Sequence, residues 1–81
     1  MRMLGTIAHT AYQITVFGWA EKYIVKIEAR GLEQAYKFPQ EAYDSWKDLE
    51  SLFDEAMLEQ VRQVFQLMAS AMSASVARRS T

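Results

Sequence analysis

The sequence contains no cysteine, a single histidine, a single proline and three glycines among its 81 residues. Without cysteine no disulfide can cross-link the chain, and with one histidine a metal site of the His/Cys type is excluded. A chain this short buries only roughly 60–65% of the surface that its unfolded form exposes, so its own core gives marginal stability. Association with another chain is the remaining common way to stabilise so small a domain.

Long apolar runs are also missing, so the sequence predicts no membrane-spanning helix and no membrane partner. Residues 1–8 carry one arginine and a short apolar stretch interrupted by Gly5, which does not fit a secretory signal peptide. Together with the lack of cysteine, this pattern predicts a cytoplasmic protein. Apolar residues make up 51% of the chain, which is ample for one folded domain.

Charge is distributed unevenly along the chain, although the formal net charge is only −1. Residues 1–39 are mildly basic, residues 40–60 are strongly acidic with Lys47 as their one basic side chain, and residues 61–81 hold arginines and no acid. This polarity suits self-association, or an internal match between sheet and helix, as well as an outside partner. The near-neutral sum gives no bulk attraction for nucleic acid.

Alternation of apolar and polar residues predicts three antiparallel strands between residues 9 and 38. The clearest is residues 22–30, where every second side chain is apolar and Ile24 is the only apolar residue on the other face. Residues 9–17 and 32–38 show the same alternation. Residues 1–8 are ambiguous, since they either fray or extend the first strand.

Two turns connect the predicted strands. Residues 18–21 offer the first, and Arg30-Gly31 marks the second because glycine accepts a positive φ there. A two-residue turn at Arg30-Gly31 would place Ala29 opposite Leu32 on the apolar face. The three apolar sets then agree in register, which predicts a β-meander with one apolar face.

A run without glycine or proline follows Pro39 and continues to about Ala74. Its first half places apolar residues on one helical face, namely Ala42, Tyr43, Trp46, Leu49, Leu52, Phe53 and Ala56. The predicted fold class is therefore α+β, a three-stranded antiparallel β-meander covered in two layers by a C-terminal helix or helix pair. Residues 1–76 would form a single domain, with the helical part at about 40–74, fraying from Ser73 onward and a flexible tail at 77–81.

The helical run changes phase near its middle. The first apolar stripe would continue at Gln60 and Gln63, but apolar residues instead resume from Met57 onward, and Asp54 is able to cap a second helix there. One helix across residues 40–73 would span roughly 50 Å, against about 27 Å for an eight-residue strand. Its second half would therefore overhang the sheet or turn back. One long bent helix and two helices broken near residues 54–57 both fit.

The second half of the run has more apolar surface than one contact needs, which predicts that it meets either two surfaces, or one surface and another molecule. A homodimer or another protein partner would cover this association surface. Its expected residues are Met57, Leu58, Val61, Val64, Phe65, Met68 and Met72.

The outer face of the sheet offers an alternative function, the binding of single-stranded nucleic acid. Bases stack on exposed aromatic side chains while basic side chains contact phosphates. The residues expected to do so are Phe17, Trp19, Lys22, Lys26, Arg30 and Lys37.

The chain shows a strand followed by a turn and a covering helix. The strand ends at Phe38, the turn is Pro39-Gln40-Glu41, and the helix carries apolar residues at Trp46 and Leu49. This pattern resembles the broad plan of the positive-coactivator type of single-stranded DNA-binding protein, in which a helix covers a curved meander. The resemblance is one of pattern, and it implies nucleic-acid binding on the sheet. Three glutamates dilute the positive field, so protein association is the leading hypothesis.

The sequence shows no combination of acid, base and nucleophile residues that would form a catalytic site. It therefore predicts a non-enzymatic protein without a cofactor or metal. His9 lacks a partner that would make it a general base. An acidic series lies roughly along one helical face, where a solvated surface fits better than a cation site built from oxygen ligands. Its members are Glu41, Asp44, Asp48, Glu55 and Glu59.

Overall fold

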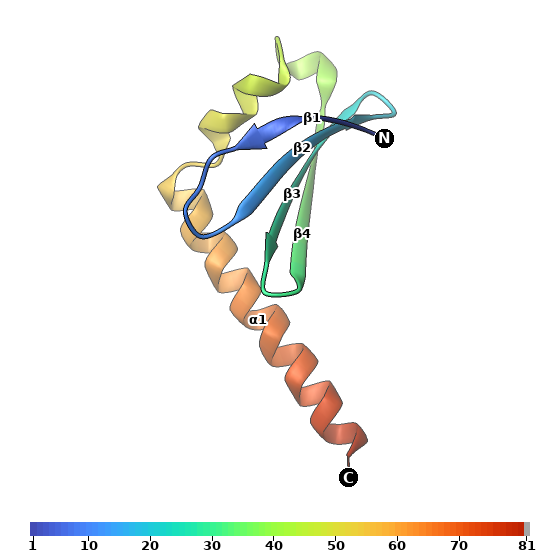
Figure 1. Ribbon diagram of the computed structural model, residues 1–81, viewed down its shortest axis with the longest axis vertical. Coiled ribbons are helices and arrows are strands. Elements are labelled where there is room, and N and C mark those ends of the chain that lie inside the picture. Colours follow the sequence, from blue (N-terminus) through green and yellow to red (C-terminus); the bar gives the residue numbers. More distant parts are fainter. Residues whose placement is uncertain (81) are drawn as a thin grey trace.

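The computed structural model describes residues 1–80, which form an antiparallel sheet followed by two 3₁₀ helices and a long α-helix (Figure 1). The strands are β1 (Arg2–Ile7), β2 (Gln13–Trp19), β3 (Lys22–Ala29) and β4 (Leu32–Pro39), and they lie in the sheet in the order of the sequence. The predicted α+β class and the β-meander are confirmed. The sheet has four strands where the sequence predicted three, because residues 2–7 form a strand of their own.

A β-bulge explains why β1 was ambiguous in the sequence. Ile7 pairs with Ile14, and Gly5 pairs with Val16, but the register shifts between Gly5 and Met3. A bulge inserts an extra residue and so breaks the two-residue alternation that identifies a strand. Bulges are also common on edge strands such as β1, where they discourage pairing with another sheet.

The register of β2, β3 and β4 agrees with the predicted apolar sets. Val16 and Val25 face each other across β2 and β3, as do Ile14 and Ile27. Ala29 lies opposite Leu32, as the two-residue turn required. The residues of these apolar sets therefore form one inner face, and this face holds the core.

Both β-hairpin turns use left-handed backbone conformations. Arg30 and Gly31 have φ of 51° and 79° in the turn between β3 and β4, which confirms the predicted reversal. In the turn between β2 and β3 the positive φ values of 51° and 64° belong to Ala20 and Glu21. Matched positive φ values at two central residues are typical of the tight turns that suit the twist of a β-hairpin.

Residues 40–53 cover the inner face of the sheet, but not as an α-helix. The chain forms η1 (Gln40–Ala42) and η2 (Trp46–Leu52), both 3₁₀ helices, so the prediction of α-helix over this segment is wrong. Ser45 interrupts the run with an extended backbone, and its side chain accepts a hydrogen bond from the N–H of Lys47. The Asp48 carboxylate accepts from the N–H of Ser45, which completes a capping box.

The long helix α1 (Glu55–Arg79) begins at Asp54, whose carboxylate accepts a 2.9 Å hydrogen bond from the N–H of Met57. Of the two arrangements that the sequence left open, the structure therefore shows a break at residue 54. The helix does not fray from Ser73, since it continues as far as Arg79 and includes residues 77–79 of the expected tail. Thr81, the end of that expected tail, lies outside the described residues.

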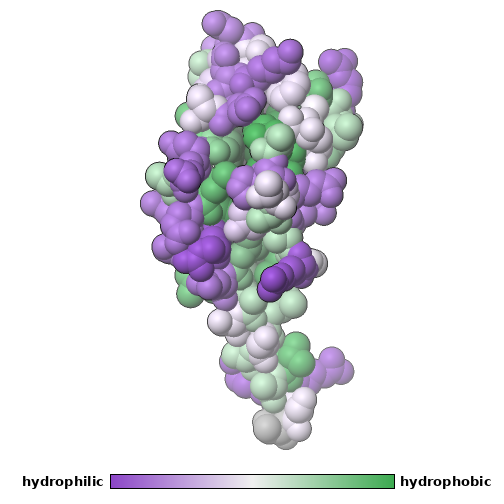
Figure 2. Space-filling view, turned by 60° about the vertical axis from the view of Figure 1, so that its left-hand side comes forward, coloured by the Kyte–Doolittle hydropathy of each residue, from purple (hydrophilic) through white to green (hydrophobic). Residues whose placement is uncertain are grey.

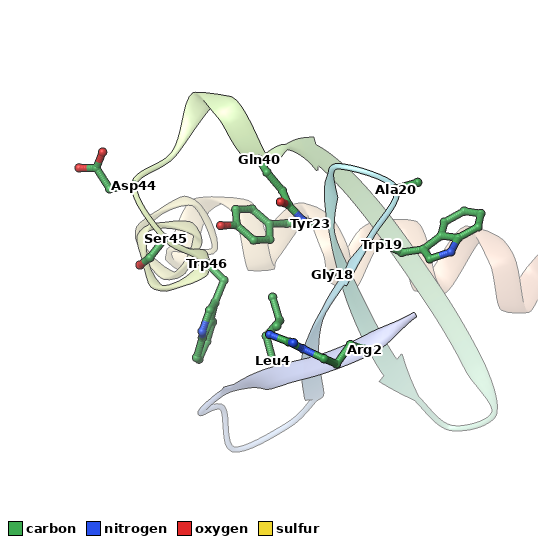
Figure 3. Close-up of a pocket in the computed structure, with 10 residues that line it drawn as sticks. All are labelled: Arg2, Leu4, Gly18, Trp19, Ala20, Tyr23, Gln40, Asp44, Ser45 and Trp46. Carbon is green, nitrogen blue, oxygen red and sulfur yellow. The ribbon is translucent and has the colours of Figure 1, made fainter.

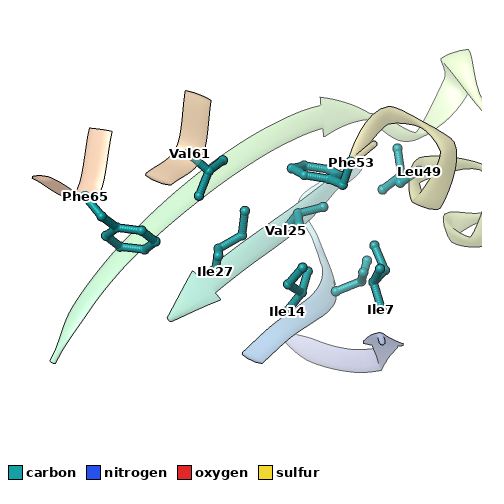
Figure 4. Packing of buried hydrophobic residues seen from close by; sticks show 9 residues of the cluster. Ile7, Ile14, Val25, Ile27, Leu49, Phe53, Val61 and Phe65 are labelled. Carbon is teal, nitrogen blue, oxygen red and sulfur yellow. The ribbon is translucent and has the colours of Figure 1, made fainter. Parts of the chain in front are cut away.

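The core lies between the sheet on one side and η2 with the first half of α1 on the other (Figure 4). The sheet and the helical segments both contribute to it, with Ile7, Ile14, Val16, Val25, Ile27, Leu49, Phe53, Val61 and Phe65 buried together. The buried Gln34 joins the two layers, because its side-chain amide donates a 2.9 Å hydrogen bond to the carbonyl oxygen of Val61. This bond fixes the position of α1 on β4.

Candidate interaction surfaces

The last three turns of α1 extend beyond the sheet. Every residue from 69 to 79 is exposed, and we call this segment the arm. Met68 is the last residue of the helix that packs on the core. Eleven helical residues span about 16 Å, and the arm gives the molecule its elongated form of 52 × 27 × 18 Å (Figure 1).

The predicted association surface is divided between the core and the solvent. Val61 and Phe65 are only 1% and 8% exposed, so the surface that they pack against is the protein's own sheet. Met57, Leu58 and Met68 are half-buried against the same core. Val64 and Met72 are 39% and 59% exposed. The structure therefore corrects the expected surface, because its central residues belong to the fold of one chain.

Two exposed residues of α1 were missing from the predicted set. Leu67 is 70% exposed and Val76 is 64% exposed. Val76 continues the stripe that includes Phe65 and Met72, beyond the point where the sheet ends. Leu67 belongs instead to a second, neighbouring stripe of the helix, which we call the lateral stripe and which comprises Val64, Leu67, Ala71 and Ala74. Its spacing of three, four and three residues was visible in the sequence and is typical of helix–helix contacts.

Charge changes sign along α1. The helix begins with Asp54 as its cap and Glu55 in its first turn, and it ends with Arg78 and Arg79. Acids at the start and bases at the end both match the helix dipole. Glu59 is paired with Arg62 at 2.6 Å, and hydrogen bonds from Arg62 lower the pKa of the Glu59 carboxyl.

The outer face of the sheet brings together part of the predicted nucleic-acid site. Lys26 lies with its Nζ 5.1 Å from the centroid of the Phe17 ring, a cation–π contact. Ile24 pairs with Phe17 on one side and with Lys37 on the other. Phe17, Lys26 and Lys37 are therefore neighbours on this face.

The remaining members of that predicted site lie at the ends of the sheet. Lys22 pairs with Trp19 next to one turn, and Arg30 is part of the other turn. Glu28 pairs with Glu33 next to Arg30. The outer face thus has a basic and aromatic half around Phe17 and an acidic pair at its opposite end.

A hollow of about 510 Å³ lies between η2 and the ends of β1 and β2 (Figure 3). Leu4, Tyr23 and Trp46 contribute to its lining, while the side chain of Trp19 points away from the others. Gln40 donates a 3.1 Å hydrogen bond to the carbonyl oxygen of Lys22. Among the described residues, no buried side-chain nitrogen or oxygen lacks a hydrogen-bond partner. The hollow therefore offers no unpaired buried polar group to orient a ligand.

His9 has a local structural role. Its Nδ1 accepts hydrogen bonds from the N–H groups of Ala11 and Tyr12, at 3.0 and 3.3 Å, and its ring stacks on that of Tyr12. These contacts order the loop between β1 and β2. Within residues 1–80, no three histidine or acidic side chains gather in a way that would hold a metal ion. Among the same residues, no helix has both the length and the apolar character needed to cross a membrane.

Comparison of the chain with protein-family models, with curated proteins and with solved structures found no match. The surfaces of the molecule are therefore the guide to its function. The arm of α1 exposes Met72 and Val76, and the outer face of the sheet holds the cluster of Phe17, Lys26 and Lys37.

Proposed function

We propose that this protein is a small non-enzymatic module that self-associates through the exposed part of α1. One observation carries the proposal: α1 continues for eleven residues past its last contact with the core, and its exposed part presents large apolar side chains at Leu67, Met72 and Val76. Figure 2 shows the arm as a narrow projection with few hydrophilic residues over much of the face in view. Such a surface is typical of a protein–protein contact.

Helix stability supports the same conclusion. A helical segment of this length is marginal in water by itself, and most helical stability in proteins comes from packing of an apolar face. The arm contains four alanines, which are the strongest helix formers, and three serines, which are only average, but none of its residues packs on the core. The ion pair between Glu59 and Arg62 lies in the part of α1 that precedes the arm. Burial against another chain would provide the packing that the arm does not find in its own domain.

Sedimentation velocity over a range from micromolar to near-millimolar protein tests the proposal. We expect the wild-type protein to associate as its concentration rises, and the triple substitution Leu67→Ser, Met72→Ser and Val76→Ser to remain monomeric with an unchanged sheet. Leu52→Ser is the matched control, because Leu52 is also an exposed apolar residue but lies in η2. A wild-type protein that stays monomeric throughout this range would contradict the proposal.

The outer face of the sheet supports a second candidate function, the binding of single-stranded nucleic acid. The observation in its favour is the cluster formed by Phe17, Lys26 and Lys37 on the face of the sheet opposite the core. Aromatic stacking and phosphate contacts are the two components of such binding. A base would have to displace Lys26 from the Phe17 ring before it could stack there. This displacement adds to the free-energy cost of binding.

Fluorescence anisotropy with a labelled single-stranded oligonucleotide tests this second candidate. The double substitution Lys26→Glu and Lys37→Glu should weaken binding at low salt and reduce its salt dependence, since each lysine would neutralise a phosphate. Lys47→Glu is the control, because Lys47 is exposed, as Lys37 is, but lies in η2. Absence of wild-type binding at low salt, where phosphate contacts are strongest, would exclude nucleic-acid binding.

A further inference from the structure

We infer that two copies of this chain associate as an antiparallel pair of α1 helices, in contact along the lateral stripe of Val64, Leu67, Ala71 and Ala74. The inference rests on the proposed self-association and adds the partner's orientation and register. Of the exposed residues that carry that proposal, Leu67 lies in the lateral stripe, whereas Met72 and Val76 lie on the neighbouring stripe of the helix. The inference follows from three features of α1. These are the angular position of its exposed residues around the helix axis, the distribution of its charge and the sizes of its side chains.

The lateral stripe lies at a different angle around the helix axis from the residues that face the sheet, so it is not covered by the sheet. Val61 and Phe65 face the sheet and are buried, whereas Val64 is 39% and Leu67 70% exposed. Successive helical residues are separated by about 100°, so Val64 lies to one side of the stripe that packs on the sheet. The lateral stripe runs from the sheet-covered half of α1 into the arm without a break. A second helix can therefore pack along it without moving the sheet.

Charge complementarity selects the direction of the second helix. Each α1 has Asp54, Glu55 and Glu59 near its start and Arg79 at its end, and no acid lies between residues 60 and 80. A parallel pair would place arginines beside arginines and acids beside acids. An antiparallel pair places the basic end of each helix beside the acidic start of the other, and it also opposes the two helix dipoles.

Side-chain size selects the register. When Val64 of one helix faces Ala74 of the other, Leu67 faces Ala71, so that each large side chain meets a small one, which allows close packing. The same register brings Glu59 level with Arg79. The twofold axis then passes near Ala69, just beyond Met68, the last residue of α1 that packs on its own core. The contact is isologous, and it places the two sheets toward opposite ends of the helix pair.

Disulfide cross-linking tests this arrangement directly, because the natural chain has no cysteine to interfere. We would mix the single variants Val64→Cys and Ala74→Cys under mild oxidation. In the antiparallel register these positions face each other, whereas two copies of either residue alone are about 15 Å apart along the helix axis. Cysteine pairs need Cα atoms within about 7 Å. Circular dichroism of each variant would check that both exposed positions tolerate the change.

The expected result is that the mixture cross-links several-fold faster than either variant alone. A mixture of Gln66→Cys with Ala74→Cys is the control, because Gln66 lies on the opposite side of α1 from Val64 and should give only the collisional rate. Cross-linking of Ala74→Cys with itself at the rate of the mixture would indicate a parallel pair and overturn the inference. A wild-type protein that associates while the mixture shows only the control rate would also overturn it, and the proposed self-association would stand. A monomeric wild-type protein would overturn both.

Discussion

The side-chain amide of Gln34 in β4 donates a 2.9 Å hydrogen bond to the carbonyl oxygen of Val61 in α1. Gln34 also accepts a hydrogen bond from the Tyr36 hydroxyl, so its amide is used on both sides. A buried amide with satisfied donors and acceptors holds its neighbours in one arrangement. This link sets the position of α1 on the sheet, and hence the direction in which the arm extends.

Replacing Gln34 should weaken the attachment of α1. Gln34→Ala removes the hydrogen bond to Val61 and leaves the Tyr36 hydroxyl without its acceptor, so we expect a loss of about 1–3 kcal/mol in the free energy of unfolding. Urea denaturation measures this loss. Glu33→Ala is the control, because Glu33 is exposed on the other face of the same strand and should cost within about 0.5 kcal/mol. Equal losses for both variants would contradict this role of Gln34.

Gly5 and Trp46 provide a second test of the packing. A Cβ atom added at Gly5 would lie 2.6 Å from Cζ2 of the Trp46 indole, so the ring and with it η2 would have to move. We expect Gly5→Ala to lower the free energy of unfolding by about 1–3 kcal/mol and to change the tryptophan fluorescence. In Gly18→Ala the nearest atom would be Cδ1 of Leu4 at 3.3 Å, the end of a flexible side chain. That variant should be better tolerated, and the reverse order would show that Trp46 is not held against β1.

Phe65 belongs to the core and its neighbour Val64 to the proposed contact, so substitutions at the two positions distinguish the two roles. Phe65 is buried with its ring centroid 5.7 Å from that of Tyr12, so Phe65→Ala should cost about 3–5 kcal/mol even in dilute, monomeric protein. Val64→Ala removes a partly exposed side chain and should cost much less under the same conditions. Thermal melts at two protein concentrations measure both effects. A small, concentration-dependent effect of Phe65→Ala would mean that Phe65 lies at an intermolecular contact instead.

The pair formed by Glu59 and Arg62 predicts a pH effect of known sign. Hydrogen bonds from Arg62 hold the pKa of Glu59 below its ordinary value of about 4.5. A carboxyl with a lowered folded-state pKa adds stability that is present above its unfolded pKa and is lost as the pH falls through the folded pKa. Because both side chains are exposed, solvent keeps this contribution small.

NMR titration of the Glu59 carboxyl measures this shift. In dilute, monomeric protein, Arg62→Ala should raise the pKa of Glu59 toward its ordinary value. Arg79→Ala should leave it unchanged there, since Arg79 lies about 30 Å along the same helix from Glu59. An unchanged pKa in Arg62→Ala would show that the ion pair does not persist in solution.

The strands β2, β3 and β4 were predictable from the sequence because one face of each is buried. Burial of one face imposes a two-residue alternation, and with the two-residue turn at Arg30-Gly31 it predicted the pairing of Ala29 with Leu32. β1 was not predictable in the same way, because its bulge near Gly5 interrupts the alternation. The turn at Ala20 and Glu21 was assigned only to residues 18–21, since neither residue carries the usual glycine signal.

The 3₁₀ helix η2 was mistaken for part of an α-helix because both kinds of helix show a similar spacing of apolar residues. Tyr43, Trp46, Leu49 and Leu52 are spaced by three residues, and three residues per turn is the period of a 3₁₀ helix. Ser45 followed by Asp48 was the missed indication of a new start, since this pair forms the capping box. Leu49 nevertheless packs in the core, so the covering role of the segment was predicted correctly.

The apolar surplus of α1 was predictable, but its division into two stripes was not. Neighbouring residues such as Val64 and Phe65 are equally apolar in the sequence, and only the position of the sheet decides which of them is buried. The sequence therefore assigned Val61 and Phe65 to the association surface and omitted Leu67, which the structure leaves most exposed of the large apolar residues of α1.

Hydrogen–deuterium exchange of the arm amides, followed as a function of protein concentration, tests the central claim most directly. Exchange reports local opening of the helix, and binding of a second chain to the closed form slows it. We predict that amides of residues 69–79 exchange rapidly in dilute protein and become protected as the concentration rises, while amides of β2 and β3 change little. Arm amides whose exchange is the same at every concentration would contradict the proposal that another copy of the chain covers the arm.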